Sequence, residues 1–151
     1  MCDTDGQTRQ AGPPVECQLH EAYYRPLVRL AALLTGDPHA AEEVACDALS
    51  ALPRWLAPGG DDVASYLQRR VLLRCRRTRR PQRSAAPGFA LLPVVRALQE
   101  LPPHGREAVV LMHYLDLTHQ QAAVVAGVSE AVLQKRLGHA MQMLQDRLPQ
   151  A

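Results

Sequence analysis

The chain has 151 residues, of which 47% are apolar and only 4% are aromatic. This composition excludes wholesale disorder and favours helices over sheets, because the core must be built from Leu, Val and Ala. No stretch approaches the roughly 18 apolar residues of a membrane span, and residues 1–14 lack the apolar run of a signal peptide. We therefore expect a cytoplasmic protein whose four cysteines, which show no zinc-binding spacing, are free thiols.

The net charge of +2 conceals an uneven distribution along the chain. Residues 1–62 carry four Arg against ten acidic residues, a net charge of −6. Residues 63–99 carry nine Arg and no acid, and residues 100–151 carry four basic and five acidic side chains. An acidic, a strongly basic and a nearly neutral segment indicate three surfaces with different partners.

The first half of the chain is predicted to form three helices after a flexible leader, residues 1–16. Apolar residues at helical spacing predict the first helix over 17–34. Asp37-Pro38 is a strong helix start, and the second helix should run to about Leu56 unless Pro53 shortens it. Asp61 or Asp62 should cap a third helix that reaches Arg80.

A linker rich in Pro, Ser, Ala and Gly, residues 81–92, should separate this domain (17–80) from a second one (93–149). The second domain should hold a short helix ending by Leu101 and another over 103–115. The sequence thus predicts an all-α protein with two small domains.

Residues 119–137 have the pattern of a helix-turn-helix. Thr118 and Gln121 fit a capping box, Gly127 suits a left-handed turn, and Ser129 should cap a last helix that runs to about Leu148. In this motif the second helix enters the DNA major groove with its N-terminal residues. That geometry brings a set of polar side chains closest to DNA: Glu130, Gln134, Lys135 and Arg136.

The third predicted helix ends in a run of eight Arg between Arg69 and Arg83 without one acid. Its apolar face, which includes Leu67 and Val71, implies a docked helix, so the arginines are expected to meet a polyanion. Two alternatives remain: a solvated helix end leading into the linker, and binding to a membrane surface. The absence of Trp and Phe from the apolar face disfavours the membrane.

Taken together, these segments resemble the extracytoplasmic-function sigma factors of bacterial RNA polymerase, particularly actinobacterial ones. The N-terminal resemblance is carried by residues 24–30 (YRPLVRL), 33–37 (LLTGD) and 40–44 (AAEEV). The C-terminal resemblance is carried by residues 101–103 (LPP), 106–107 (RE), 114–118 (YLDLT) and the helix-turn-helix. Both sets occur in the order that the family has.

The resemblance implies an alternative sigma factor that binds core RNA polymerase and directs promoter-specific initiation. It implies promoter DNA as a partner, an anti-sigma factor as a further one, and a location in the cytoplasm at the nucleoid. It places core binding on Glu43, Cys46 and Asp47. It places the minus-ten element at Arg69, Arg70, Arg74, Arg76 and Arg77. It places the minus-thirty-five element on the recognition helix, where His139 joins Gln134, Lys135 and Arg136.

Several promoter-reading positions depart from the family pattern. Leu73 stands near a usual Asn, Thr78 near a usual aromatic residue, and His139 at a usual basic residue. Opening a duplex relies on stacking of unpaired bases, and only Trp55 and Tyr66 offer an aromatic ring in that part of the chain. A sigma-like co-regulator or anti-sigma decoy, and a plain helix-turn-helix regulator, are therefore alternative interpretations.

The sequence does not predict an enzyme. The six histidines are scattered, and no glycine-rich loop could cradle a phosphate. Glu42 and Glu43 are adjacent on a helix, so their carboxylates diverge by about 100° and do not share a face. No cofactor and no metal site are expected.

Overall fold

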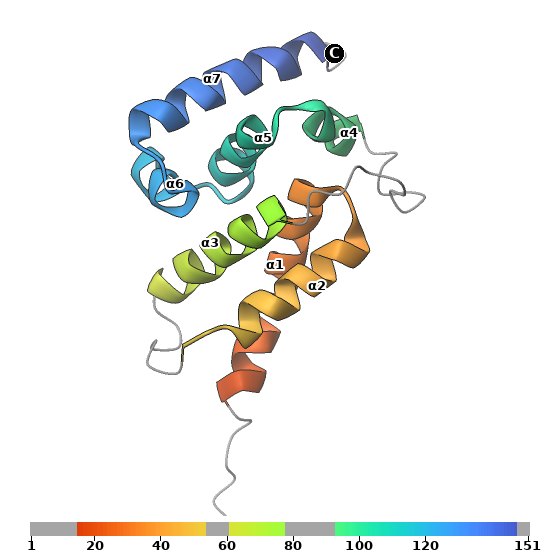
Figure 1. Cartoon of the computed structure of the whole chain (residues 1–151), viewed down its shortest axis with the longest axis vertical. Helices are drawn as coiled ribbons and strands as arrows, with labels where there is room; N and C mark the ends of the chain where they lie inside the picture. Colours follow the sequence, from red (N-terminus) through yellow and green to blue (C-terminus); the bar gives the residue numbers. More distant parts are fainter. Residues whose placement is uncertain (1–14, 54–60, 78–92, 148–151) are drawn as a thin grey trace, which may run out of the picture.

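The computed structural model describes residues 15–53, 61–77 and 93–147, and all its elements there are helices. Figure 1 shows two units stacked on one another. We call helices α1 to α3 the N-terminal unit and helices α4 to α7 the C-terminal unit. The all-α prediction is confirmed. Most of the predicted leader and the whole predicted linker lie outside the described residues.

Helices α1 (Val15–Thr35) and α2 (Pro38–Ser50) pack side by side in the N-terminal unit. The predicted stripe of α1 is buried, and Leu30 and Ala31 are almost inaccessible. Asp37 caps α2 as predicted, because its side chain accepts a hydrogen bond of 2.9 Å from the His39 backbone N–H. The sequence therefore predicted this helical pair closely.

Helix α2 ends earlier than predicted, at Ser50 rather than near Leu56. Proline disfavours helical backbone in the residue before it, so Pro53 is incompatible with continuation through Leu52. The Tyr66 hydroxyl donates a 3.1 Å hydrogen bond to the carbonyl of Ala51 and so satisfies an acceptor at this end.

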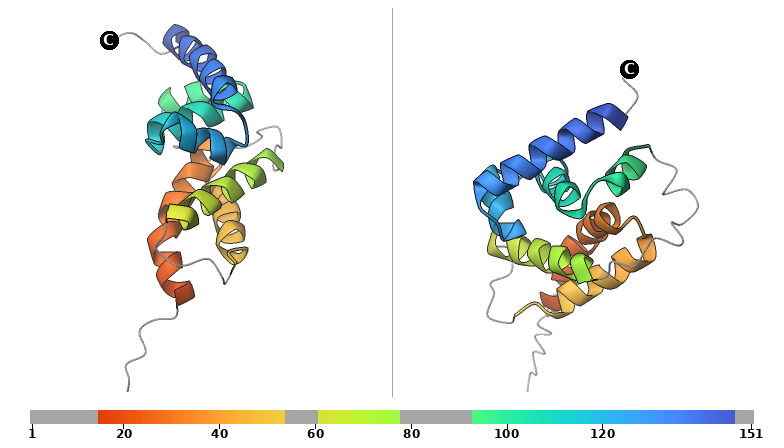
Figure 2. Two further views of the ribbon diagram at one scale, coloured as in Figure 1. Left: turned by 90° about the vertical axis from the view of Figure 1, so that its left-hand side faces the viewer. Right: turned by 45° about the horizontal axis from the view of Figure 1, so that its top comes forward.

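Helix α3 (Asp61–Arg77) begins where predicted, and the rest of its predicted length, 78–80, lies outside the described residues. Its buried face comprises Val63, Leu67, Val71 and Leu72. This face packs on α1 and α2, and the helix also contacts α6 of the other unit. Helix α3 therefore lies on the side of the N-terminal unit that faces the C-terminal unit, as the views of Figure 2 show.

The C-terminal unit begins with α4 (Pro93–Glu100) and α5 (Pro103–Val109), close to the predicted helices. The predicted helix over 103–115 changes character at Val110, where a π-helical segment, η1 (Val110–Tyr114), follows. There the Leu115 backbone N–H donates to the carbonyl of Val110, five residues earlier, at 3.1 Å. Apolar periodicity could not reveal this widened turn.

One apolar cluster runs through both units, from Leu27 in α1 to Leu144 in α7. Two polar side chains add hydrogen bonds across the junction at the end of α1. Gln99 donates to the carbonyl of Leu33 at 2.9 Å, and Arg106 donates to that of Leu34 at 2.7 Å. The division into domains 17–80 and 93–149 stays a prediction, because the core is continuous across it.

Candidate nucleic-acid interface

Helices α6 (His119–Ala126) and α7 (Glu130–Arg147) form the predicted pair of helices around a tight turn. The capping box is present: the Gln121 N–H donates to Thr118 Oγ1 at 3.2 Å, and the Thr118 N–H donates to Gln121 Oε1 at 3.1 Å. Gly127 has φ +72°, a left-handed conformation that favours glycine. The turn chemistry read from the sequence is confirmed.

Helix α7 buries one side and exposes the other. Leu133 and Ala140 face the core, and α5 packs against this side. The side chains predicted to meet DNA lie outward: Glu130, Gln134, Lys135 and His139 are exposed, and Arg136 is partly exposed. Ser129 caps the helix by accepting the Val132 N–H at 3.3 Å. The helix that would enter a major groove is therefore accessible along its predicted face.

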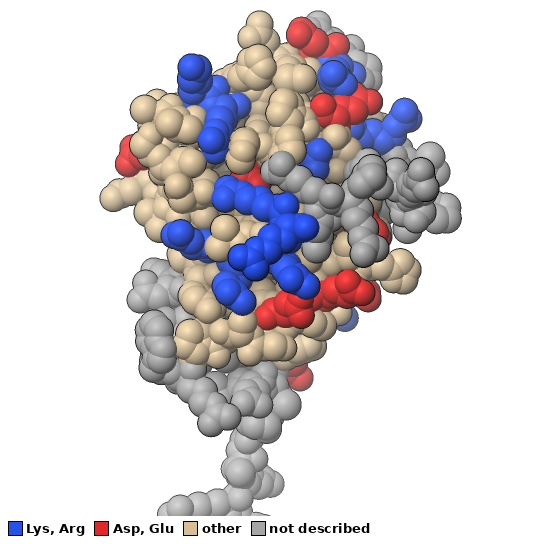
Figure 3. Space-filling model, viewed as in Figure 1, with Lys and Arg blue, Asp and Glu red and all other residues tan. Residues whose placement is uncertain are grey.

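The arginines of α3 form a second polar surface, which Figure 3 shows as a basic cluster beside acidic residues. Arg69, Arg70, Arg74 and Arg77 are exposed, whereas Arg76 is partly buried. The structure therefore brings most of the predicted arginines to the surface but separates Arg76 from them.

A groove of about 370 Å³ runs between α2 and α3. One wall is lined by Arg70, Leu73, Arg74 and Arg77, and the other by the end of α2 and the residue after it: Asp47, Ala48, Ser50 and Ala51. Arg74 Nη2 lies 3.1 Å from Asp47 Oδ2, and both side chains are about half exposed. Such an exposed pair contributes at most about 1 kcal/mol to stability.

Helix α2 presents an acidic face next to this groove. Glu43, Cys46 and Asp47 are exposed, while Ala41, Val44, Ala45 and Ala48 are buried beneath them. The three residues predicted to bind core polymerase thus share an accessible surface on a firmly packed helix.

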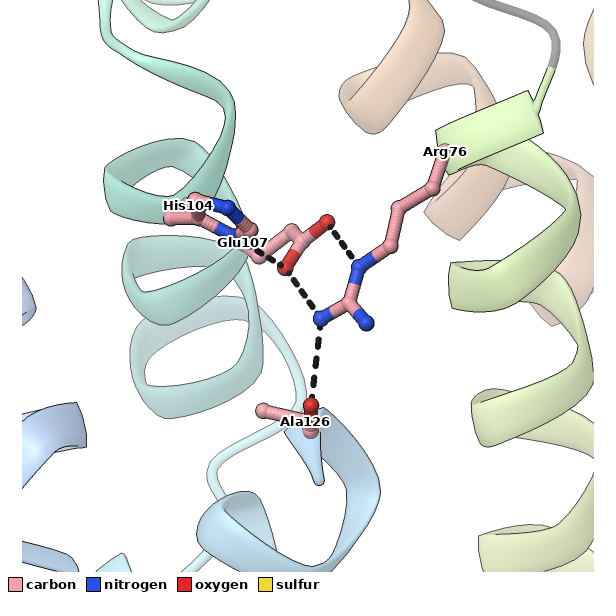
Figure 4. Close-up of polar contacts among 4 residues, drawn as sticks. All are labelled: Arg76, His104, Glu107 and Ala126. Atoms are coloured by element: carbon pink, nitrogen blue, oxygen red, sulfur yellow. Dashed lines mark hydrogen bonds and ion pairs between the residues drawn. The ribbon is translucent and has the colours of Figure 1, made fainter. Parts of the chain in front are cut away.

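Arg76 makes the most extensive polar contact between the two units (Figure 4). Its Nε donates to Glu107 Oε1 at 2.9 Å, and its Nη2 donates to Glu107 Oε2 at 2.8 Å and to the Ala126 carbonyl at 3.1 Å. His104 Nδ1 lies 3.7 Å from the same carboxylate. The hydrogen bonds to Glu107 raise the pKa of Arg76. Arg76 is therefore engaged with its own chain, and about 25% of its side chain stays exposed.

Sequence reasoning missed Glu107 as the partner of an arginine on α3. Glu107 is the one buried charged residue in the part of the chain that the structure describes. Its position, four residues before buried Leu111, places a carboxylate on the apolar face of its helix. A charge on such a face needs a buried partner, so this position was the available signal.

Two other classes of site find no support in the described ranges. No group of three His, Cys, Asp or Glu side chains there could hold a metal ion. No helix among the described residues has the length and apolar character needed to cross a membrane.

Comparison with known proteins finds a family model that matches one part of the chain. Residues 91–144 match the family model described as sigma-70, region 4, and this range covers α4 to most of α7. No curated protein sequence matches the chain.

Two solved structures are similar over most of the chain. The first is CnrH in complex with the cytosolic domain of CnrY, 24% identical, with a TM-score of 0.72 over 87% of this chain and 85% of that one. The second is the sigma factor RpoE in complex with the anti-sigma factor NepR from Bartonella quintana. It is 17% identical, with a TM-score of 0.60 over 86% of this chain and 94% of that one. At these identities the similarity establishes a shared fold.

Proposed function

We propose that the chain is an alternative sigma factor of the extracytoplasmic-function class, which binds core RNA polymerase and directs promoter-specific transcription initiation. One observation carries this proposal: the range that matches sigma-70, region 4 coincides with a helix-turn-helix whose second helix is exposed. The shared fold with RpoE, itself named a sigma factor, extends the similarity to both units.

In this proposal the C-terminal unit reads the minus-thirty-five element. Helix α7 enters the major groove, where base edges present distinct patterns of donors and acceptors. Gln134, Lys135 and Arg136 carry donors that suit such edges, with Glu130 and His139 at either end of the face. The near-neutral charge of this unit means that phosphate contacts from the rest of the protein must supply much of the affinity.

The N-terminal unit is assigned the other two tasks. Glu43, Cys46 and Asp47 on α2 dock on core polymerase, where an acidic face requires a basic partner surface. The arginines of α3 bind the DNA of the minus-ten element: Arg69, Arg70, Arg74, Arg76 and Arg77.

We also propose that the chain has an anti-sigma factor as a partner and that the chain itself acts in the cytoplasm at the nucleoid. RpoE is described in complex with the anti-sigma factor NepR, and CnrH in complex with the cytosolic domain of CnrY. A chain of the same fold offers comparable surfaces for such a partner.

Runoff transcription tests the central proposal. Purified chain is added to core RNA polymerase with a template that contains the region upstream of its own gene, and we expect discrete transcripts that core alone does not make. Asp47→Arg should abolish co-purification with core and all transcripts while leaving the helical circular dichroism unchanged. Asp146→Arg, the same charge change on exposed α7, is the matched control. Retained core binding by Asp47→Arg contradicts the assigned docking surface.

A second candidate function is a sigma-like co-regulator or anti-sigma decoy that has lost part of its DNA chemistry. It is favoured by Arg76, a predicted DNA contact that instead binds Glu107, and by the scarcity of aromatic residues for strand opening. Binding to core polymerase without any transcript favours this candidate over the first. DNA binding without core binding favours a plain regulator.

A further inference from the structure

The arginines of α3 lie on two different faces of the helix. Arg70, Arg74 and Arg77 follow one another at intervals of four and three residues and line the groove with α2. Arg69 and Arg76 are seven residues apart, which is two helical turns, and both reach towards α6. The basic segment therefore has one face towards the groove and one towards the C-terminal unit.

Both members of the second pair bind the end of α6. Arg69 Nη1 donates to the Val124 carbonyl at 3.4 Å, and Arg76 Nη2 donates to the Ala126 carbonyl at 3.1 Å. These carbonyls belong to the last turn of α6, where the helix dipole favours cations. The Val124 carbonyl also accepts a 3.2 Å hydrogen bond from the Gly127 backbone N–H. The attachment lies next to Gly127, the turn before the recognition helix.

Glu107 makes the attachment at Arg76 specific. Its residue surface is only 5% exposed, and both carboxylate oxygens accept hydrogen bonds from the guanidinium. A bidentate pair of this kind is among the strongest charge-assisted contacts. Loss of Arg76 leaves a buried carboxylate that depends on a weak contact with His104 at 3.7 Å.

We propose that Arg76 and Glu107, with Arg69 beside them, form a latch that holds the C-terminal unit against α3 and withholds one edge of the Arg76 guanidinium from DNA. Glu107 occupies the Nε and Nη2 edge of Arg76, which is an edge that would otherwise bind an anion bidentately, so a phosphate and Glu107 compete for that edge. Arg70, Arg74 and Arg77 lie outside the latch and are exposed in the closed form. The inference rests on the proposed function only in naming DNA as the competitor.

Opening separates α3 from α5 and α6 while the second attachment between the units persists. That attachment joins Arg106 and Gln99 to the end of α1 and involves no residue of α3. The C-terminal unit therefore turns about the end of α1 when the latch releases. In the closed form Arg69 shares an open groove with Gly127, Ser129 and Glu130, and this movement takes Arg69 out of that groove.

The latch is tested first without DNA, by energy transfer between two dyes on the full chain. One dye is placed on exposed Cys46 in α2 and the other on Gln142→Cys in α7, with Cys2 and Cys17 changed to Ser and Cys75 to Ala. Glu107→Gln should lower the transfer efficiency because the neutral amide holds Arg76 weakly. Glu100→Gln is the control, since Glu100 pairs with Arg147 inside the C-terminal unit. Equal efficiencies in both variants overturn the latch.

A charge exchange guards against simple misfolding of the single variants. The double variant Arg76→Glu with Glu107→Arg restores an opposite-charge pair at the same place. It should recover transfer efficiency lost in Arg76→Glu alone. Failure of recovery, with helical content unchanged, counts against a specific ion pair and overturns the latch.

The competition with DNA is measured separately, by fluorescence anisotropy of a 30-base-pair duplex of arbitrary sequence at low salt. If the latch withholds the Arg76 guanidinium, Glu107→Gln should bind about fivefold more tightly than the parent, the lower end of usual coupling between sites. Weaker or unchanged binding by Glu107→Gln overturns the competition. If no variant binds DNA while energy transfer still responds to Glu107→Gln, the latch stands and the proposed function fails.

Discussion

At the residue scale, a cysteine on α3 lies in a setting that suppresses its chemistry. Cys75 is partly buried next to the junction between the units, and burial, together with the charge of Glu107, raises the pKa of its thiol to about 12. The thiolate is the reactive form of cysteine, so this thiol is held in its inert form at neutral pH. Cys46 on α2 is exposed, and neither residue takes part in a disulfide.

Thiol labelling with a chromogenic disulfide at pH 8 should therefore leave Cys75 almost untouched in the folded chain. With Cys2, Cys17 and Cys46 replaced by Ser, its rate should be about a thousandfold lower in the native state than in denaturant, since the unfolded pKa is about 8.5. Similar rates in both states contradict this environment.

The same shift sets a dependence of stability on pH. A thiol whose pKa is higher in the folded state contributes stability that is complete below the unfolded pKa of about 8.5. This contribution is lost as the pH rises towards 12. Between pH 9 and pH 11, the free energy of unfolding of the parent chain should fall more steeply than that of Cys75→Ala.

At the element scale, two glycines in helices play opposite parts. A Cβ at Gly105 in α5 would lie 3.1 Å from the Cβ of Ala140 in α7, so this glycine lets the two helices approach closely. A Cβ at Gly138 in α7 would meet nothing within 4 Å. The cost of Gly138 follows from its place inside a helix, whereas the role of Gly105 depends on the helix that lies across from it.

Alanine substitution at the two glycines should change the stability of the chain in opposite directions. Gly138→Ala should stabilise the chain by about 1 kcal/mol through helix propensity alone. Gly105→Ala should destabilise it, because overpacking between rigid helices costs about 1–3 kcal/mol and outweighs the same propensity gain. Urea denaturation measures both.

A double variant, Gly105→Ala with Ala140→Gly, serves as the control. It moves the missing methyl group to the facing helix and should return the stability close to that of the parent. If Gly105→Ala proves stabilising, α5 and α7 have more freedom to separate than their contact indicates.

At the scale of the whole molecule, local patterns predicted the helices better than the contacts between the units. Thr118, Gln121 and Gly127 act within a few residues of one another, so the capping box and the left-handed turn can be predicted from the local sequence. Arg76 and Glu107 are 31 positions apart, and nothing local distinguishes Arg76 from its neighbouring arginines. The sequence thus identified which residues belong to the candidate site. Which arginines face the groove and which face the C-terminal unit could be seen only in the fold.

Arg106 supplies one of the side-chain hydrogen bonds that join the two units. Its guanidinium donates to the carbonyl of Leu34 at the end of α1 and to those of Leu98, Gln99 and Leu101 around the end of α4. It therefore supplies donors to carbonyls at two helix ends, of which that of Leu98 also accepts from the Leu101 backbone N–H at 3.2 Å. Together with the continuous apolar cluster, this contact should make the two units unfold as one.

Arg106→Met tests that expectation, because methionine fills a similar space without any donor. The substitution should lower the free energy of unfolding by about 3 kcal/mol, since several partly buried carbonyls lose a charged partner. Arg147→Met, which breaks only the exposed pair with Glu100, should cost less than about 1 kcal/mol. The parent chain should show a single urea transition by circular dichroism and by fluorescence. Two separate transitions in the parent, or equal losses in the two variants, would mean that the units are stabilised independently and that the end of α1 cannot serve as the pivot of the latch.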